Sequence, residues 1–214
     1  MRSSTPIPGE PWPHDMLLTI EDRPHALLEL LWLREAYALQ LYGDDLPPLL
    51  LDTPSTVRGT ALGSATRDEW EGTWSRIWQA AVAHAGPDTD PRLFDKIQAT
   101  ANGSTERADL LQRIVGPGWR HEFGDSAFDH DSYSTWSRAG MDAAVAAAQA
   151  RLEDHPERRD LLALIPAWHA GLTKIVTIPC RGEFTRRVSK NALLMTATTR
   201  ADSDSYRRAL GSFI

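Results

Sequence analysis

The fold class is decided by residues 173–199, TKIVTIPCRGEFTRRVSKNALLMTATT. Three β-branched or apolar runs in this stretch predict strands over residues 173–178, 184–188 and 192–199. Short segments of turn-forming residues separate the runs. Because parallel strands need long crossover connections, these short connections favour an antiparallel meander.

The residues on either side of this stretch have helical patterns. Apolar residues at helical spacing, capping residues and an alanine-rich run predict helices, which cover residues 22–43, 66–85, 90–101, 104–115, 134–152 and 158–170. Asp202 or Ser203 caps a short final helix over residues 205–210. The sequence therefore predicts an α+β fold, a mainly helical body with a small C-terminal antiparallel β-meander and a terminal helix.

The expected domain organisation is a short arm followed by one folded unit. Residues 1–15 are rich in proline and predict a flexible N-terminal arm, whose Trp12 is suited to docking on another subunit. Residues 16–214 form a single α+β domain, with a helical body over 16–171 and a β-meander plus helix over 172–214. One cooperative domain is expected because three strands alone are marginally stable.

Composition indicates an ordinary cytoplasmic protein. Hydrophobic residues make up 42% of the chain and charged residues 24%, values typical of soluble globular proteins. The single cysteine, Cys180, cannot form an internal disulfide, and an ordinary strand-end thiol is the expected role for it. No uncharged apolar run approaches the roughly 18 residues of a membrane span. We therefore expect a cytoplasmic location and no membrane partner.

Charge is distributed unevenly along the chain. The net charge is −6, yet residues 173–214 hold 8 basic and 3 acidic side chains. We call residues 172–214 the basic unit. In the predicted strand over 184–188, Arg186 shares the apolar face, and a charge there needs a carboxylate or an anionic ligand.

Three roles for the basic unit follow from its charge. It docks against the acidic helical body, it binds an acidic partner protein or a second copy of the chain, or it binds an anionic ligand or nucleotide. The candidate binding residues are Arg186, Arg187, Lys190 and Arg200. Nucleic acid is disfavoured as a partner, because the whole chain is acidic and carries no nucleic-acid-binding motif.

A polar segment over residues 121–131 is the candidate metal site. Two histidines and four carboxylates lie within eleven residues, and these are common ligands of divalent metals. A metal-dependent hydrolase would use His121, Asp125 and His130 as ligands and Glu122 as base. The alternative is a polar surface loop, since the spacing matches no established metal motif.

Three tryptophans recur along one predicted helix. Trp70, Trp74 and Trp78 stand at i, i+4 and i+8, so the three rings lie close to one face of the helix. A ligand-binding aromatic wall is one interpretation of this stripe. Core packing is favoured, because large apolar rings on one face usually point inward.

No motif in the sequence identifies a reaction. The chain lacks a dinucleotide fingerprint, a P-loop lysine and a nucleophile elbow, which leaves open whether it is an enzyme. Our first hypothesis is a cytosolic binding or accessory protein that acts through protein–protein contacts. The alternatives are the metal-dependent hydrolase over residues 121–131 and the anion or nucleotide binder that uses the basic unit. No cofactor other than a divalent metal is suggested.

Overall fold

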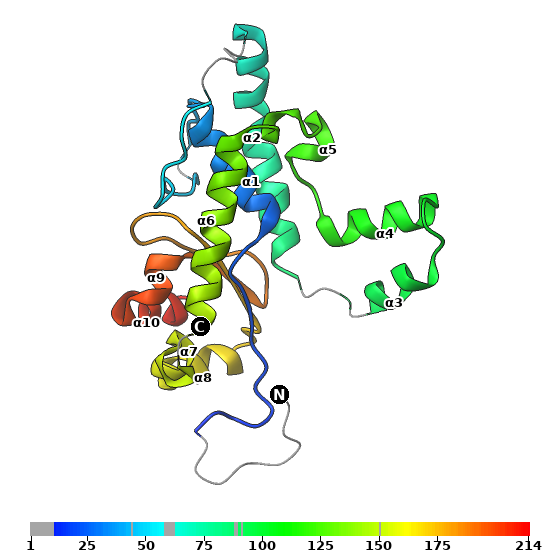
Figure 1. Ribbon diagram of the computed structural model, residues 1–214. Coiled ribbons are helices and arrows are strands. Elements are labelled where there is room, and N and C mark those ends of the chain that lie inside the picture. The colour runs from blue at the N-terminus through cyan, green and yellow to red at the C-terminus, as the bar shows by residue number, and fades with distance from the viewer. Residues whose placement is uncertain (1–10, 44, 58–62, 88–89, 91, 150) are drawn as a thin grey trace.

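The structure is a computed structural model that describes residues 11–43, 45–57, 63–87, 90, 92–149 and 151–214 (Figure 1). Over these residues the fold is α+β, as the sequence predicts: helices predominate, and a small four-stranded sheet is built mainly from residues near the C-terminus.

The elements of the described part of the chain have the following bounds. The α-helices are α1 (His25–Ala36), α2 (Ser64–Ala85), α3 (Arg92–Ala99), α4 (Thr105–Val115), α5 (Trp119–Phe123), α6 (Asp131–Ala148), α7 (Pro156–Arg159), α8 (Leu161–His169), α9 (Ala197–Ala201) and α10 (Ser203–Gly211). The 3-10 turns are η1 (Ser126–Phe128) and η2 (Leu152–Asp154). The strands are β1 (Thr19–Glu21), β2 (Lys174–Ile178), β3 (Thr185–Arg187) and β4 (Ala192–Thr196).

The sheet is mixed, so the prediction of a simple antiparallel meander is wrong. Its strand order is β1-β2-β4-β3, with β1, β2 and β4 parallel and only β3 antiparallel to β4. Strand β3 follows β2 in sequence but lies at the edge of the sheet, and β4 lies beside β2. Both β2 and β4 are buried along their whole length, as is typical of strands covered on both faces.

Helices cover the two faces of the sheet. Val176 and Leu194 point into a core shared with α1 and α2, whereas Ile175 and Leu193 point into a core shared with α8 and α10. The basic unit is therefore an integral layer of the molecule. The N-terminal part of the chain joins it through β1, where Thr19 N–H donates to the Thr173 carbonyl at 2.8 Å.

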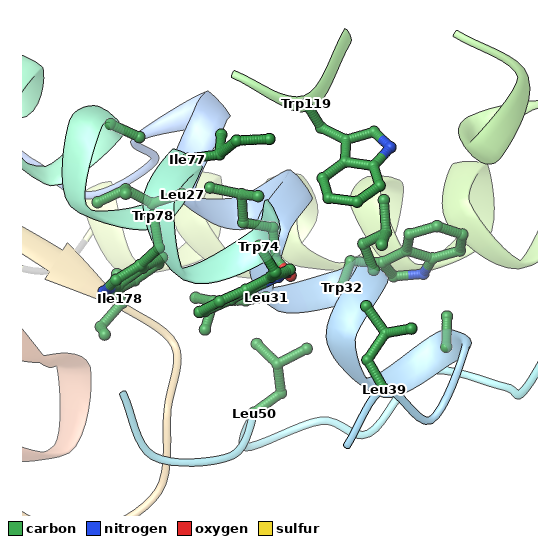
Figure 2. Packing of buried hydrophobic residues seen from close by; sticks show 14 of the residues in the cluster. Leu27, Leu31, Trp32, Leu39, Leu50, Trp74, Ile77, Trp78, Trp119 and Ile178 are labelled. Carbon is green, nitrogen blue, oxygen red and sulfur yellow. The ribbon is translucent and has the colours of Figure 1, made fainter. Parts of the chain in front are cut away.

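The larger core is rich in tryptophan (Figure 2). Trp74 and Trp78 from α2 are stacked with their ring centroids 5.3 Å apart, and Trp74 Nε1 donates to the Leu30 carbonyl of α1 at 2.8 Å. Trp70 packs edge-on against Trp119 with a centroid separation of 5.0 Å. All four rings are buried, which confirms the core-packing interpretation of the tryptophan stripe.

Several helix ends differ from the sequence-based expectation. Helix α1 stops at Ala36 rather than near Gly43, because the chain turns at Ala38, whose φ is +50°. Asp22 does not cap α1, since its carboxylate is held by other residues described below. The expected loop 116–131 contains α5 and η1. The Asp202 cap of the last helix is confirmed, with Asp202 accepting from Ser205 N–H.

Two parts of the chain lie at the margins of the molecule. Helices α3 and α4 project to one side, away from the sheet (Figure 1). The predicted arm is described only from residue 11 onward, and its residues 1–10 lie outside the described part. Trp12 contacts its own chain: its Nε1 donates to the Met16 carbonyl at 3.1 Å, and the Arg158 guanidinium lies 4.7 Å from the ring centroid. Among the described helices, none combines the length and apolarity needed to cross a bilayer.

Candidate functional site

The carboxyl ends of the parallel strands meet around one carboxylate. Asp22 follows β1, Thr177 lies near the end of β2, and Arg200 lies in α9 directly after β4. Thr177 Oγ1 donates to Asp22 Oδ1 at 2.9 Å, and Arg200 Nη1 donates to the same oxygen at 3.2 Å. This edge of an open parallel sheet is where ligands commonly bind.

Glu157 of α7 completes the cluster from below the sheet edge. Arg200 donates from Nε and Nη2 to its two carboxylate oxygens at 2.7 and 2.8 Å, and the Tyr206 hydroxyl donates to Oε1 at 3.2 Å. Burial lowers the pKa of Arg200, but the hydrogen bonds and charge of Glu157 outweigh this and keep that pKa above its ordinary value. Burial raises the pKa of Tyr206, so its hydroxyl keeps its proton. We call Asp22, Glu157, Arg200 and Tyr206 the arginine cluster.

A second buried carboxylate joins α8 to the C-terminal helix. Asp160 accepts from Ser203 Oγ at 2.6 Å, Arg207 Nε at 2.7 Å and Arg159 Nε at 2.8 Å. Burial raises the pKa of Asp160, but these three hydrogen bonds outweigh burial and hold the pKa below its ordinary value. Asp160 is therefore ionised at neutral pH, and its carboxylate accepts hydrogen bonds from three side chains.

A large groove opens between the arginine cluster and α6. Its volume is about 1310 Å³, and we call it the α6 groove. One wall consists of residues 136–148 of α6. The other wall is formed by residues from the segments 12–28, 50–52 and 154–158, and the ends of β2 and β4 lie between the two walls. Most of the lining is apolar and includes Leu18, Ile20, Leu28, Leu51, Ala143 and Ala144.

Helix α6 borders the groove without being packed against the body along its length. It has 18 residues, and none of them is buried. Its first half is anchored: the Tyr133 ring lies 5.0 Å from that of Trp32, and Trp136 Nε1 donates to the Asp52 carbonyl at 3.1 Å. From this anchor α6 extends toward α7 (Figure 1), with Met141 and Val145 exposed on its outer side.

Arg23 is a cation of the groove lining. Its Nη2 donates to the Ser137 carbonyl of α6 at 3.3 Å. A Cβ atom at Gly140 would lie only 2.8 Å from Arg23 Nη1, so a side chain at this position would require the flexible end of Arg23 to shift. Among the described residues, no carboxylate lies within ion-pair distance of Arg23.

The candidate cations of the basic unit are dispersed. Of the four, only Arg200 lines the groove. Arg186 donates to Gln79 Oε1 at 2.8 Å, while its Nη1 is buried and without a hydrogen-bond partner. Arg187 lies 4.1 Å from the Phe213 ring centroid and donates to the Phe213 carbonyl, and Lys190 is exposed. Arg200 forms an ion pair with Glu157 of α7.

The predicted metal residues have other surroundings. Asp125 Oδ1 accepts from Arg120 Nη1 at 2.6 Å, and the His130 ring lies edge-on to Tyr37 with a centroid separation of 6.4 Å. Glu122, the proposed base, is paired with Arg76, whose hydrogen bond lowers the pKa of Glu122. Within the described residues, no three His, Cys, Asp or Glu side chains are placed to hold a metal ion, and His121 is exposed. The metal site stays a sequence prediction.

Cys180 is unsuited to nucleophilic chemistry. The residue is buried at the end of β2, and burial raises the pKa of its thiol to about 12. A thiol is a weak nucleophile without ionisation, so the expected role as an ordinary strand-end cysteine agrees with its surroundings.

Known proteins give no guide to the role of this groove. No family model, curated protein or solved structure matches the chain. Functional inference therefore rests on the groove and on the residues that surround it. The sequence analysis missed the groove, although one signal was present: alanines at 139, 143, 144, 147 and 148 share one face of α6, which then carries no bulky core side chain.

We expect Arg200→Met to destabilise the protein by about 3–5 kcal/mol, because Glu157 would be left buried without its cation. Arg208→Met removes the exposed pair with Glu183 and is the matched control, expected to cost less than about 1 kcal/mol. Urea unfolding of the three proteins measures both effects. Equal losses in the two variants would contradict the structural role of the arginine cluster.

Asp160→Asn should make the free energy of unfolding less sensitive to a fall in pH. Since the pKa of Asp160 is lowered by folding, its ionised form stabilises the native state above about pH 4, and this contribution is lost as pH falls through the folded pKa. Unfolding free energies at pH 7, 5 and 3 should show a difference between the wild type and Asp160→Asn that shrinks toward pH 3. Asp204→Asn, at an exposed position of α10, is the control. A difference that stays constant over this range would show that the Asp160 charge is not what stabilises the fold.

Proposed function

We propose that this protein is a binding protein rather than an enzyme, and that its ligand lies in the α6 groove. The observation that carries the proposal is the exposure of α6: an 18-residue helix with an alanine-rich face borders a cavity of about 1310 Å³ and buries none of its residues. A helix with an apolar face normally buries that face against another surface. A bound ligand would supply this surface.

The dimensions and lining of the groove support a ligand with a large apolar part. Typical sites for small molecules have volumes of about 300–1,000 Å³ and are mostly apolar with a few placed polar groups. The groove is at least as large, and its polar lining includes Arg23, Arg200, Asp52 and Asp154. Each 100 Å² of apolar surface removed from water contributes about 2.5 kcal/mol, so an apolar ligand gains affinity along this wall.

The state of the ionisable groups favours binding over bond-breaking chemistry. Asp22 and Glu157, two of the carboxylates that line the groove, are both paired with Arg200. General acid–base catalysis needs a group that can exchange a proton near the working pH. The Arg200 guanidinium instead donates hydrogen bonds to the oxygens of both carboxylates. The arginine cluster thus supports the wall of a binding site.

A neutral fluorescent probe tests the groove without involving charge. We expect N-phenyl-1-naphthylamine to bind the wild type and to gain fluorescence. Ala144→Phe places a ring in the groove and should weaken binding at least about tenfold, equivalent to ~1.4 kcal/mol. Ala146→Phe introduces the same ring on the same helix at a position that does not line the groove, so its affinity should match the wild type.

Equal binding of the probe by both variants would overturn this proposal. So would a lack of binding by the wild type, once circular dichroism and thermal unfolding show that it is folded. The thermal midpoints of the two phenylalanine variants are measured alongside. A loss of stability confined to Ala144→Phe would require repeating the comparison with Ala143→Leu, a smaller obstruction on the same face.

A second candidate function is the accessory role expected from the sequence, in which the chain contacts a protein partner or a second copy of itself. The observation that favours it is the projecting pair of helices α3 and α4, where Phe94 is 56% and Val115 is 60% exposed. Exposed apolar side chains that cluster commonly mark interaction sites. Multi-angle light scattering should then give a mass above 23.8 kDa that returns to the monomer value in Phe94→Ser. A monomeric wild type at micromolar concentration would remove self-association from consideration.

A further inference from the structure

The α6 groove is spanned at one point by a single side chain. Arg23, two residues beyond β1, reaches from the sheet edge to the Ser137 carbonyl and lies against Gly140 of α6. An α-helix with its side chains is about 10–12 Å in diameter, which is wider than the reach of one arginine. At this point the groove therefore admits a slender ligand and not a helix of a partner protein.

The walls beyond Arg23 are suited to hydrocarbon. Ala143, Ala144, Ala147 and Ala148 follow Gly140 along the same face of α6 for two further turns. An extended peptide in this position would bury backbone N–H and C=O groups against alanine methyl groups, and each unpaired group would cost free energy. A hydrocarbon chain has no such groups.

The charge of Arg23 indicates the polar end of the ligand. The groove is also lined by acidic residues, but Asp22 and Glu157 are paired with Arg200, and Asp52 and Asp154 are exposed. Arg23 lies in the wall, is partly buried and has no ion-pair partner among the described residues, whereas Arg158, another cation of the lining, lies against the Trp12 ring. A guanidinium binds a carboxylate through two parallel hydrogen bonds.

We propose that the α6 groove binds a long-chain carboxylic acid, with the carboxylate on Arg23 and the hydrocarbon chain along the alanine face of α6. This inference rests on the proposed function and specifies its ligand class. Gly140 is a positioning residue in this arrangement, because the missing Cβ gives the Arg23 guanidinium its place against the helix. Glycine inside a helix is otherwise unfavourable relative to alanine.

Displacement of N-phenyl-1-naphthylamine by two ligands of equal chain length tests the proposal. Dodecanoic acid and dodecan-1-ol are compared at pH 7.5, below the concentration at which either aggregates. For the wild type we expect the acid to bind roughly 10- to 150-fold more tightly than the alcohol, the range of a hydrogen bond to a charged group. Arg23→Gln should bring the affinity for the acid down to that for the alcohol and leave the alcohol unchanged. Arg138→Gln, at an exposed position of α6 outside the groove, should behave as the wild type.

Gly140→Ala provides a variant whose effect cannot come from unfolding. Alanine favours the helix, so the thermal midpoint should stay the same or rise, while displacement of Arg23 lowers the affinity for dodecanoic acid severalfold. Equal affinity of the wild type for acid and alcohol would overturn the proposal, and so would an equal loss of both in Arg23→Gln. In either case the probe would still bind, so the proposed function of the groove as a binding site would not be contradicted. Failure of the probe to bind the wild type would instead reject the proposed function.

Discussion

The structure depends on the double hydrogen bond between Arg200 and Glu157. These residues are 43 positions apart and belong to α9 and α7, and Arg200 also reaches Asp22 at the end of β1. One guanidinium thereby ties together the N-terminal strand, the segment below the sheet and the C-terminal helices. An ion pair that is mostly buried is strongly destabilising when one partner is lost, so these elements hold their relative positions together.

The same contacts create the groove. Because Asp22 is turned toward Thr177 and Arg200, the next residue, Arg23, points to α6 and sets how closely that helix can approach. Bulky aromatic contacts then fix only the first half of α6, at Tyr133 and Trp136. The alanine-rich second half lacks side chains long enough to fill the space beneath it. The sheet edge on one side and the small-residue face of α6 on the other leave a mostly apolar groove, and the Arg23 guanidinium is part of its lining.

Much of the fold was predictable from local patterns. The β-branched runs located β2 and β4 to within a few residues, and Trp70, Trp74 and Trp78 identified a core face. Strand order was not predictable, because β1 is three residues long and carries no periodicity of its own. Its pairing with β2 is set by contacts across more than 150 positions. Arg186 was singled out from the sequence as a charge in need of a carboxylate or an anionic ligand, but in the fold it donates to Gln79, and it is Arg200 that pairs with Glu157 and Asp22. The alanines of α6 indicated a helix face without bulky side chains, but the sequence does not show that the rest of the chain leaves this face uncovered, so the groove was not predicted.

Intermolecular nuclear Overhauser effects between dodecanoic acid and the labelled methyl groups of the protein test the central claim most directly. The account predicts contacts from the ligand chain to the methyl groups of Ala143, Ala144 and Leu18, which all line the groove. Ligand contacts confined to residues outside this set, or strong direct effects between the Ala144 and Leu18 methyl groups in the free protein, would show that the groove is closed and would contradict the account.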